Sequence, residues 1–94
     1  MEIIRVGVDL AKDVFQVHGV DAKEHAVWQK RLRRSTWLSE LQRHVPAGAE
    51  IGLEACSGAH HWGRELVARG YQVKLMAPQF VKPYVKSNKS DRND

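Results

Sequence analysis

The sequence predicts an α/β domain with a mixed five-stranded sheet. Three apolar, β-rich runs follow one another between residues 3 and 32 with no helical segment between them, which is typical of an antiparallel meander. Two further short strands are each preceded by a segment with the 3.6-residue period of an amphipathic helix. Strands separated by helices run parallel with right-handed crossovers, so the predicted order is β-β-β-α-β-α-β.

Alternating polarity defines the first strand, which is expected over residues 3–9. Period two places Ile4 and Val8 toward the core and Asp9 on the opposite face. A second strand is expected over residues 14–20 and a third over residues 26–32. The polar connector between these two strands, DAKE, has the length of a hairpin loop.

The pattern changes to a helical period after the third strand. Ser35 or Thr36 can cap this helix, and PAG at residues 46–48 ends it. The apolar residues that repeat at helical spacing are Trp37, Leu38, Leu41 and Val45. This helix connects the meander to the strand that follows.

The remaining elements are two strands with a helix between them. The strands are expected over residues 50–55 and 71–76. Ser57 can cap the intervening helix, which is expected to run through Arg69, and Gly70 occupies the position of a glycine that ends a helix.

This order of elements is that of the ribonuclease H-like fold, in which the first and fourth strands are neighbours. Residues 1–86 are expected to form that domain in incomplete form, followed by a polar tail over residues 87–94. The tail is expected to be mobile from about Ser87, because no following helix anchors it.

Composition is that of an ordinary globular domain. Of the 94 residues, 43% are hydrophobic and 28% are charged, and no apolar stretch approaches the roughly 18 residues of a membrane span. The first residues lack the layout of a signal peptide, so a cytoplasmic protein with no membrane partner is expected. A single cysteine, Cys56, excludes an internal disulfide.

Positive charge is distributed unevenly along the chain, whose net charge is +4. Two basic clusters stand out: Lys30, Arg31, Arg33 and Arg34, and Lys82, Lys86, Lys89 and Arg92. Clustered bases favour a polyanionic partner, although basic runs are also common on plain solvated surfaces.

Two carboxylates end strands that the predicted order makes neighbours. Asp9 ends the first strand and Glu54 ends the fourth. The carboxyl ends of parallel strands meet at one edge of the sheet, where ligands of open α/β sheets gather, so the two side chains are expected to converge. Each acid alone could be a plain strand-end or turn residue. As a pair, two close carboxylates are tolerable mainly around a hard divalent cation, Mg²⁺ or Mn²⁺.

A second pair of acids, Asp91 and Asp94, lies in the polar tail. If Ser90 caps a helix, the spacing of three residues puts both acids on one face of its first turn, where the helix dipole favours negative charge. A frayed polar tail is the alternative.

Other residues that could bind ligands have weaker patterns. Cys56 lies four residues before His60, but no further soft ligand is near them, so a zinc site is not expected. Trp37 and Trp62 fall on helix faces that should pack in the core. Trp28 lies beside two bases of the third strand and is the tryptophan best placed to contact nucleic acid.

Three segments of the chain carry a family resemblance. These are VGVDLAKDVFQV, GLEACSG and the terminal KSDRND. In this order and spacing they resemble the N-terminal, RuvC-like domain of insertion-sequence transposases with a DEDD catalytic tetrad, a group that includes the Piv-type DNA invertases. The resemblance implies that the tetrad consists of Asp9, Glu54, Asp91 and Asp94.

The resemblance also implies an activity. Members of this family are recombinases that move or invert DNA, and they use divalent metal for phosphodiester cleavage and strand transfer. The tetrad would hold two cations about 4 Å apart, as in other two-metal sites. Similar proteins form homo-oligomers, and some are guided by an RNA that the element encodes. In these proteins a serine in a separate C-terminal domain takes part in strand exchange. Such proteins are several times longer than this chain, so the chain is expected to be a fragment that is inactive by itself.

Two other functions stay open on the sequence. Actin-like ATPases and sugar kinases also begin with an apolar strand that ends in an aspartate, but they follow it with a glycine and a hydroxyl residue that hold phosphate. This chain has Leu10, Ala11 and Lys12 there. A fragment that binds nucleic acid without catalysis is the other alternative.

Overall fold

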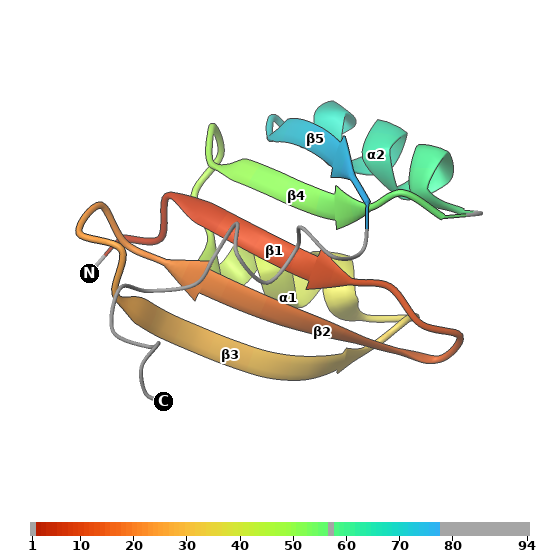
Figure 1. The fold of residues 1–94 in the computed structure, drawn as a ribbon, viewed down its shortest axis with the longest axis horizontal. Coiled ribbons are helices and arrows are strands. Elements are labelled where there is room, and N and C mark those ends of the chain that lie inside the picture. The colour runs from red at the N-terminus through yellow and green to blue at the C-terminus, as the bar shows by residue number, and fades with distance from the viewer. Residues whose placement is uncertain (1, 57, 78–94) are drawn as a thin grey trace.

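The computed structural model describes residues 2–56 and 58–77, which form a five-stranded sheet with both helices on one of its faces (Figure 1). The elements are β1 (Arg5–Asp9), β2 (Val14–Val20), β3 (Ala26–Arg33), α1 (Trp37–His44), β4 (Glu50–Glu54), α2 (Ala59–Ala68) and β5 (Gln72–Met76). The predicted α/β class and the mixed five-stranded sheet are confirmed. Within these ranges no helix is long and apolar enough to cross a membrane.

The strands lie in the order β3-β2-β1-β4-β5. β2 runs antiparallel to both β1 and β3, whereas β4 runs parallel to both β1 and β5. The connections explain this mixture, because short loops join the first three strands and a helix precedes each of the last two. As a result, the carboxyl ends of β1, β3 and β4 all point the same way and lie along one end of the sheet.

The core lies between the sheet and the two helices. Its most completely buried side chains include Val6 and Val8 of β1, Phe15 and Val17 of β2, Trp37 and Leu41 of α1, Ile51 and Leu53 of β4, and Leu66 of α2. Residues two apart on each strand point to the same face, so these valines and leucines cover one side of the sheet. Burying each such side chain stabilises the fold by roughly 1.5–3 kcal/mol.

Three aromatic rings join the sheet to both helices. Phe15 lies 5.1 Å from Trp37 and 5.6 Å from Trp62, and the two indoles are 5.4 Å apart, all between ring centroids and all edge to face. This geometry is favourable for aromatic pairs beyond the area that they bury. The cluster confirms the predicted packing of Trp37 in the core, while Trp62 is only half-buried.

The first strand begins two residues later than predicted, and Ile4 does not face the core. Ile4 is 41% exposed, whereas Ile3 is 5% exposed. The reason lies on β2, where Gly19 leaves a space that Ile3 fills: a Cβ added to this glycine would lie 3.1 Å from Ile3 Cγ2. The strand itself therefore starts at Arg5.

The predicted cap position is confirmed for the first helix but not for the second. Thr36 occupies the cap position of α1, but its side chain makes no capping hydrogen bond. The residue at the cap of α2 is Gly58 rather than Ser57, and it has a φ of 94°, a conformation that glycine adopts at little cost. Gly70, at the end of α2, has the positive φ that its predicted role requires.

The turn between β2 and β3 is organised by the buried carboxylate of Asp21. Its Oδ1 accepts hydrogen bonds from the backbone N–H groups of Lys23 and His25, both 2.9 Å away. The bond from His25 contributes most to lowering the pKa of Asp21 below 3.8, against the opposing effect of burial. The same turn places Glu24 against Arg5 as an ion pair.

This carboxylate makes the stability of the protein depend on pH. Because the pKa of Asp21 is lower in the folded state than the ordinary value of 3.8, its contribution is fully present above pH 3.8. That contribution is lost as the pH falls through the lowered value. Urea unfolding between pH 7 and pH 2.5 should show a smaller acid-induced loss for Asp21→Asn than for the wild type. The exposed Asp13→Asn is the control, and equal losses for Asp21→Asn and wild type would contradict the prediction.

Candidate active site at the ends of β1 and β4

Asp9 and Glu54 are the last residues of two neighbouring parallel strands. Each lies one residue beyond the register pair formed by Val8 and Leu53. Adjacent strands are about 4.8 Å apart, so the two acids emerge side by side. Both are half-buried. The two carboxylates were predicted to converge because β1 and β4 were expected to be neighbours. In the structure these two strands are paired.

Two glycines form the surface next to these acids. Gly7 and Gly52 are partners in the register of β1 and β4, and both are buried. Each lies two residues before a carboxylate, on the face of the sheet opposite the helices. β1 and β4 therefore carry no side chain at these two positions beside Asp9 and Glu54.

His18 of β2 is a member of this site that sequence reasoning missed. It is the register partner of Gly7, and its Nε2 lies 3.9 Å from Asp9 Oδ2. This nitrogen is buried and has no hydrogen-bond partner in the described part of the chain. Only the pairing register of β1 with β2 could have revealed it, because nine residues separate His18 from Asp9.

Glu54 also affects Cys56, which follows it in the loop before α2. Desolvation raises the pKa of the Cys56 thiol, and the charge of Glu54 raises it further. The charge of Glu54 thus acts on the first residues of the loop beyond β4.

The remaining acids of the predicted tetrad, Asp91 and Asp94, lie outside the described residues, as do the bases of the second cluster, Lys82, Lys86, Lys89 and Arg92. Within residues 2–56 and 58–77, no group of three or more histidines, cysteines and acids is placed to hold a metal ion. The described part of the site therefore offers two carboxylates, whose hard oxygen donors suit Mg²⁺ or Mn²⁺.

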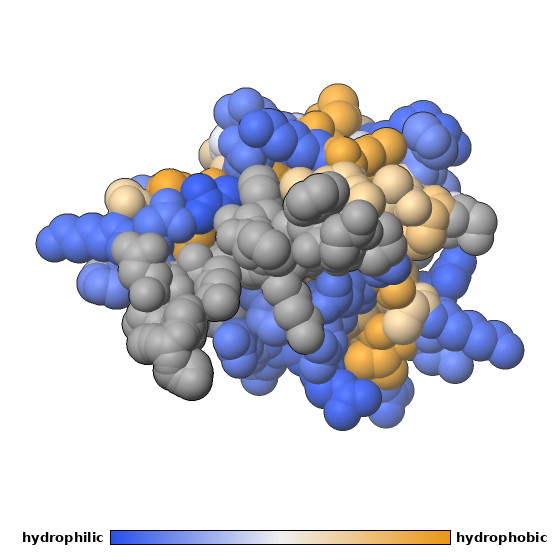
Figure 2. All heavy atoms as spheres, viewed as in Figure 1, coloured by the Kyte–Doolittle hydropathy of each residue, from blue (hydrophilic) through white to orange (hydrophobic). Residues whose placement is uncertain are grey.

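The first basic cluster divides between two faces of the sheet. Gln16 of β2 is the register partner of both Asp9 and Arg31, so these residues form one row across three strands. Arg33, two residues later on β3, lies on the same face, whereas Lys30 alternates to the other. Figure 2 shows hydrophilic residues along the edge of the sheet where β3 lies. The carboxylates and two of the bases thus share the face that the helices leave open.

Trp28 lies on the helix side of β3. Its ring stacks on that of His44, with centroids 5.0 Å apart and a tilt of 31°. It also packs against the core, so its position does not favour the contact with nucleic acid that its basic neighbours suggested.

Comparison with known proteins adds a family context. No family model matches the chain, and no solved structure matches it significantly. The whole chain is 50% identical to a Pseudomonas aeruginosa protein named "Probable family 20 transposase", of which it covers 27%. Over 95% of its length it is 45% identical to the transposase for insertion sequence element IS1111A of Coxiella burnetii, of which it covers 24%.

A more distant relative gives the same result. The transposase for insertion sequence element IS1328 of Yersinia enterocolitica is 38% identical over 92% of the chain, which covers 25% of that protein. The chain spans about a quarter of the length of the curated relatives it matches. It is thus similar, over nearly all of its length, to a quarter of proteins that are named as transposases, two of them for insertion sequences.

Proposed function

We propose that this chain is the part of a DNA transposase that carries catalytic carboxylates, in a ribonuclease H-like, RuvC-like domain. The observation that carries the proposal is the position of Asp9 and Glu54, side by side at the ends of β1 and β4. Its relatives, named as transposases, support DNA as the substrate.

Asp9 and Glu54 are proposed to bind Mg²⁺ or Mn²⁺. Two carboxylates on adjacent strands repel each other, and a divalent cation between them would remove that repulsion. Such a cation stabilises the charge that develops on phosphoryl oxygens and activates the attacking oxygen. By resemblance, Asp91 and Asp94 would complete the set of ligands. Among the described residues, the role of the chain is to hold two oxygen donors in fixed positions at the edge of a rigid sheet.

Arg31 and Arg33 are proposed to contact DNA phosphates beside the carboxylates. Both lie on the face of the sheet that also carries Asp9. Contacts to phosphates release counterions, so the affinity for DNA should fall as salt rises. A guide RNA and a second copy of the protein are further partners that the resemblance implies.

Binding of Mn²⁺, followed by NMR, tests the carboxylate site. Paramagnetic broadening should begin at the amides of Asp9, Glu54 and their glycine neighbours, and should spare the turn around Lys23 at the opposite edge of the sheet. Excess Mg²⁺ should reverse it by competition. Broadening centred on His60 and His61 would contradict the assignment.

DNA binding and thermal unfolding with ATP, measured beside this titration, separate the alternatives. Binding of DNA with no response to either cation would identify a non-catalytic nucleic-acid-binding fragment. Thermal stabilisation by ATP would identify the kinase-like alternative.

A further inference from the structure

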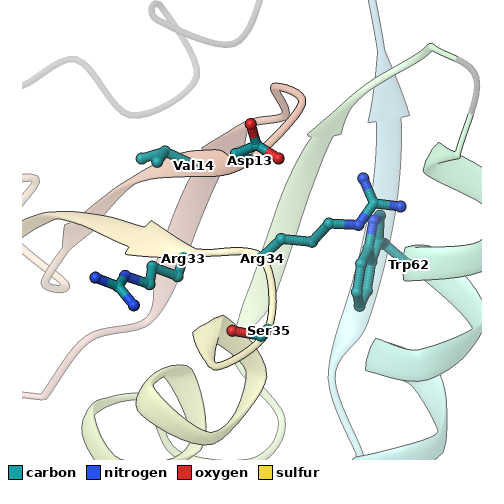
Figure 3. A pocket seen from close by; sticks show the side chains of 6 residues that line it. All are labelled: Asp13, Val14, Arg33, Arg34, Ser35 and Trp62. Carbon is teal, nitrogen blue, oxygen red and sulfur yellow. The ribbon is translucent and has the colours of Figure 1, made fainter.

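Arg34 reaches across the edge of the sheet to the ring of Trp62. Figure 3 shows its side chain extending from the end of β3 toward the indole. The Cζ atom lies 5.7 Å from the ring centroid, within the range of a cation–π contact. Nη1 donates a hydrogen bond of 3.2 Å to the carbonyl oxygen of Lys12, and the backbone N–H of Arg34 donates to the carbonyl oxygen of Asp13 at 2.8 Å. The guanidinium is therefore held by the ring of Trp62 and by the carbonyl oxygen of Lys12, and the backbone of Arg34 is held by Asp13.

Trp62 is a rigid support for this guanidinium. Its indole packs edge to face on Phe15 and Trp37, which are both buried in the core. It stays half-buried, with part of the ring at the surface. A stacking surface that is fixed before a ligand arrives loses little conformational freedom on binding.

Two hollows adjoin the Arg34–Trp62 pair, and both residues line each of them. The larger, about 670 Å³, is also lined by Asp13, Arg33 and Ser35 (Figure 3). Its size is within the range of small-molecule sites. The smaller, about 250 Å³, is lined by Leu10, which follows Asp9, and by Cys56 just beyond Glu54. The Arg34–Trp62 pair thus separates two hollows, and the smaller one includes the residue after Asp9 and a residue of the loop after Glu54.

The charge around the larger hollow is positive. Arg33 and Arg34 contribute two guanidinium groups against one acid, Asp13. Neither arginine makes an ion pair with an acid among the residues that the structure describes, whereas Arg43 and Arg69 pair with glutamates three and four residues before them. A polyanion with flat rings matches both the charge and the stacking surface.

We propose that this hollow binds one unpaired nucleotide of the nucleic acid, with its base stacked on the Arg34–Trp62 pair and the adjoining phosphate near Arg33. An unpaired nucleotide is required, because a base within a duplex has both faces covered by its neighbours. Stacking of a base on an aromatic side chain or an arginine is tolerant of sequence, so the site selects single strands rather than particular bases. This inference rests on the proposed function, since the strand held here is the nucleic acid on which Asp9 and Glu54 are proposed to act.

Binding of a short, fluorescently labelled single-stranded oligodeoxynucleotide tests this site. The measurement is anisotropy at low salt in EDTA. Arg34→Ala should weaken binding roughly tenfold, in line with the loss of one stacked base. Arg34→Lys should lose most of that affinity too, because an ammonium keeps the charge but not the planar surface. Arg64→Ala, an exposed arginine on α2, is the matched control and should bind like the wild type.

An abasic strand of the same length separates stacking from simple charge attraction. The wild type should bind it roughly tenfold more weakly than the normal strand, and Arg34→Ala should weaken it little further. Equal affinity of the wild type for both strands would overturn the stacking site. The stacking site would also be overturned if Arg34→Lys bound the oligonucleotide as tightly as the wild type. The same holds if Arg34→Ala weakened binding no more than Arg64→Ala. If Arg34→Ala is poorly folded, Arg34→Gln, which keeps the length of the side chain but not the guanidinium, supplies the same comparison.

The outcomes separate this inference from the proposed function. Mn²⁺ should still broaden the amides near Asp9 in Arg34→Ala, because Arg34 is not a carboxylate ligand. Unchanged oligonucleotide affinity in this variant, together with that broadening, would overturn the stacking site and leave the metal site standing. Loss of the Mn²⁺ response in the wild type would instead overturn the proposed function.

Discussion

Replacement of Asp9 by asparagine is expected to abolish specific Mn²⁺ binding while leaving the metal-free protein at least as stable as the wild type. Asparagine has nearly the same shape but no charge, so the loss concerns the cation rather than the packing. Loss of groups that merely orient metal ligands costs 10–100-fold in affinity, and loss of a ligand itself should cost about 100-fold or more.

The two effects of this change have opposite signs. Without metal, Asp9→Asn removes the repulsion between Asp9 and Glu54 across β1 and β4, which should stabilise the fold by up to about 1 kcal/mol. At a Mn²⁺ concentration 100 times the dissociation constant, the wild type should gain about 2.7 kcal/mol that the variant does not gain. Thermal unfolding with and without Mn²⁺ measures both effects.

Glu50→Gln provides the control for this experiment. Glu50 begins β4, at the opposite end from Glu54, and its carboxylate lies 3.3 Å from Lys74 Nζ. This variant removes one negative charge from the same strand but should keep the Mn²⁺ response. An Asp9→Asn protein with the broadening pattern of the wild type would show that the cation binds elsewhere.

Trp37→Ala is expected to remove a large part of the stability of the domain. Trp37 is fully buried at the start of α1, where it contacts both Phe15 and Trp62. Replacing such a residue by alanine costs about 3–5 kcal/mol, because contacts are lost and a cavity is left. A domain of this size is stable by roughly 5–15 kcal/mol, so urea unfolding should show a much lower midpoint.

Two further variants interpret that result. The indole Nε1 of Trp37 is buried without a hydrogen-bond partner in the described part of the chain, so Trp37→Phe breaks no hydrogen bond there and should cost much less than the alanine variant. Val67→Ala, on the exposed side of α2 with 60% exposure, should stay within about 0.5 kcal/mol of the wild type. A loss below about 1 kcal/mol for Trp37→Ala would show that the aromatic cluster does not support the fold.

Hydrophobic periodicity was sufficient to predict the elements of this fold. Alternation in β2 and the helical spacing around Leu41 reflect which faces must leave water, and that requirement is written in each segment separately. Local backbone detail was predicted less well. Gly58 rather than Ser57 caps α2, and Ile3 rather than Ile4 enters the core, because neighbouring segments decide how a chain end or loop packs.

The carboxylate pair could be predicted from the sequence. Asp9 and Glu54 end strands, and the order of strands and helices along the chain was enough to predict that those ends are neighbours. Only the tertiary structure placed His18 beside Asp9 and Arg34 over Trp62. These contacts depend on the strand register and on the angle at which α2 packs, and both are set by side-chain packing between segments far apart in the chain.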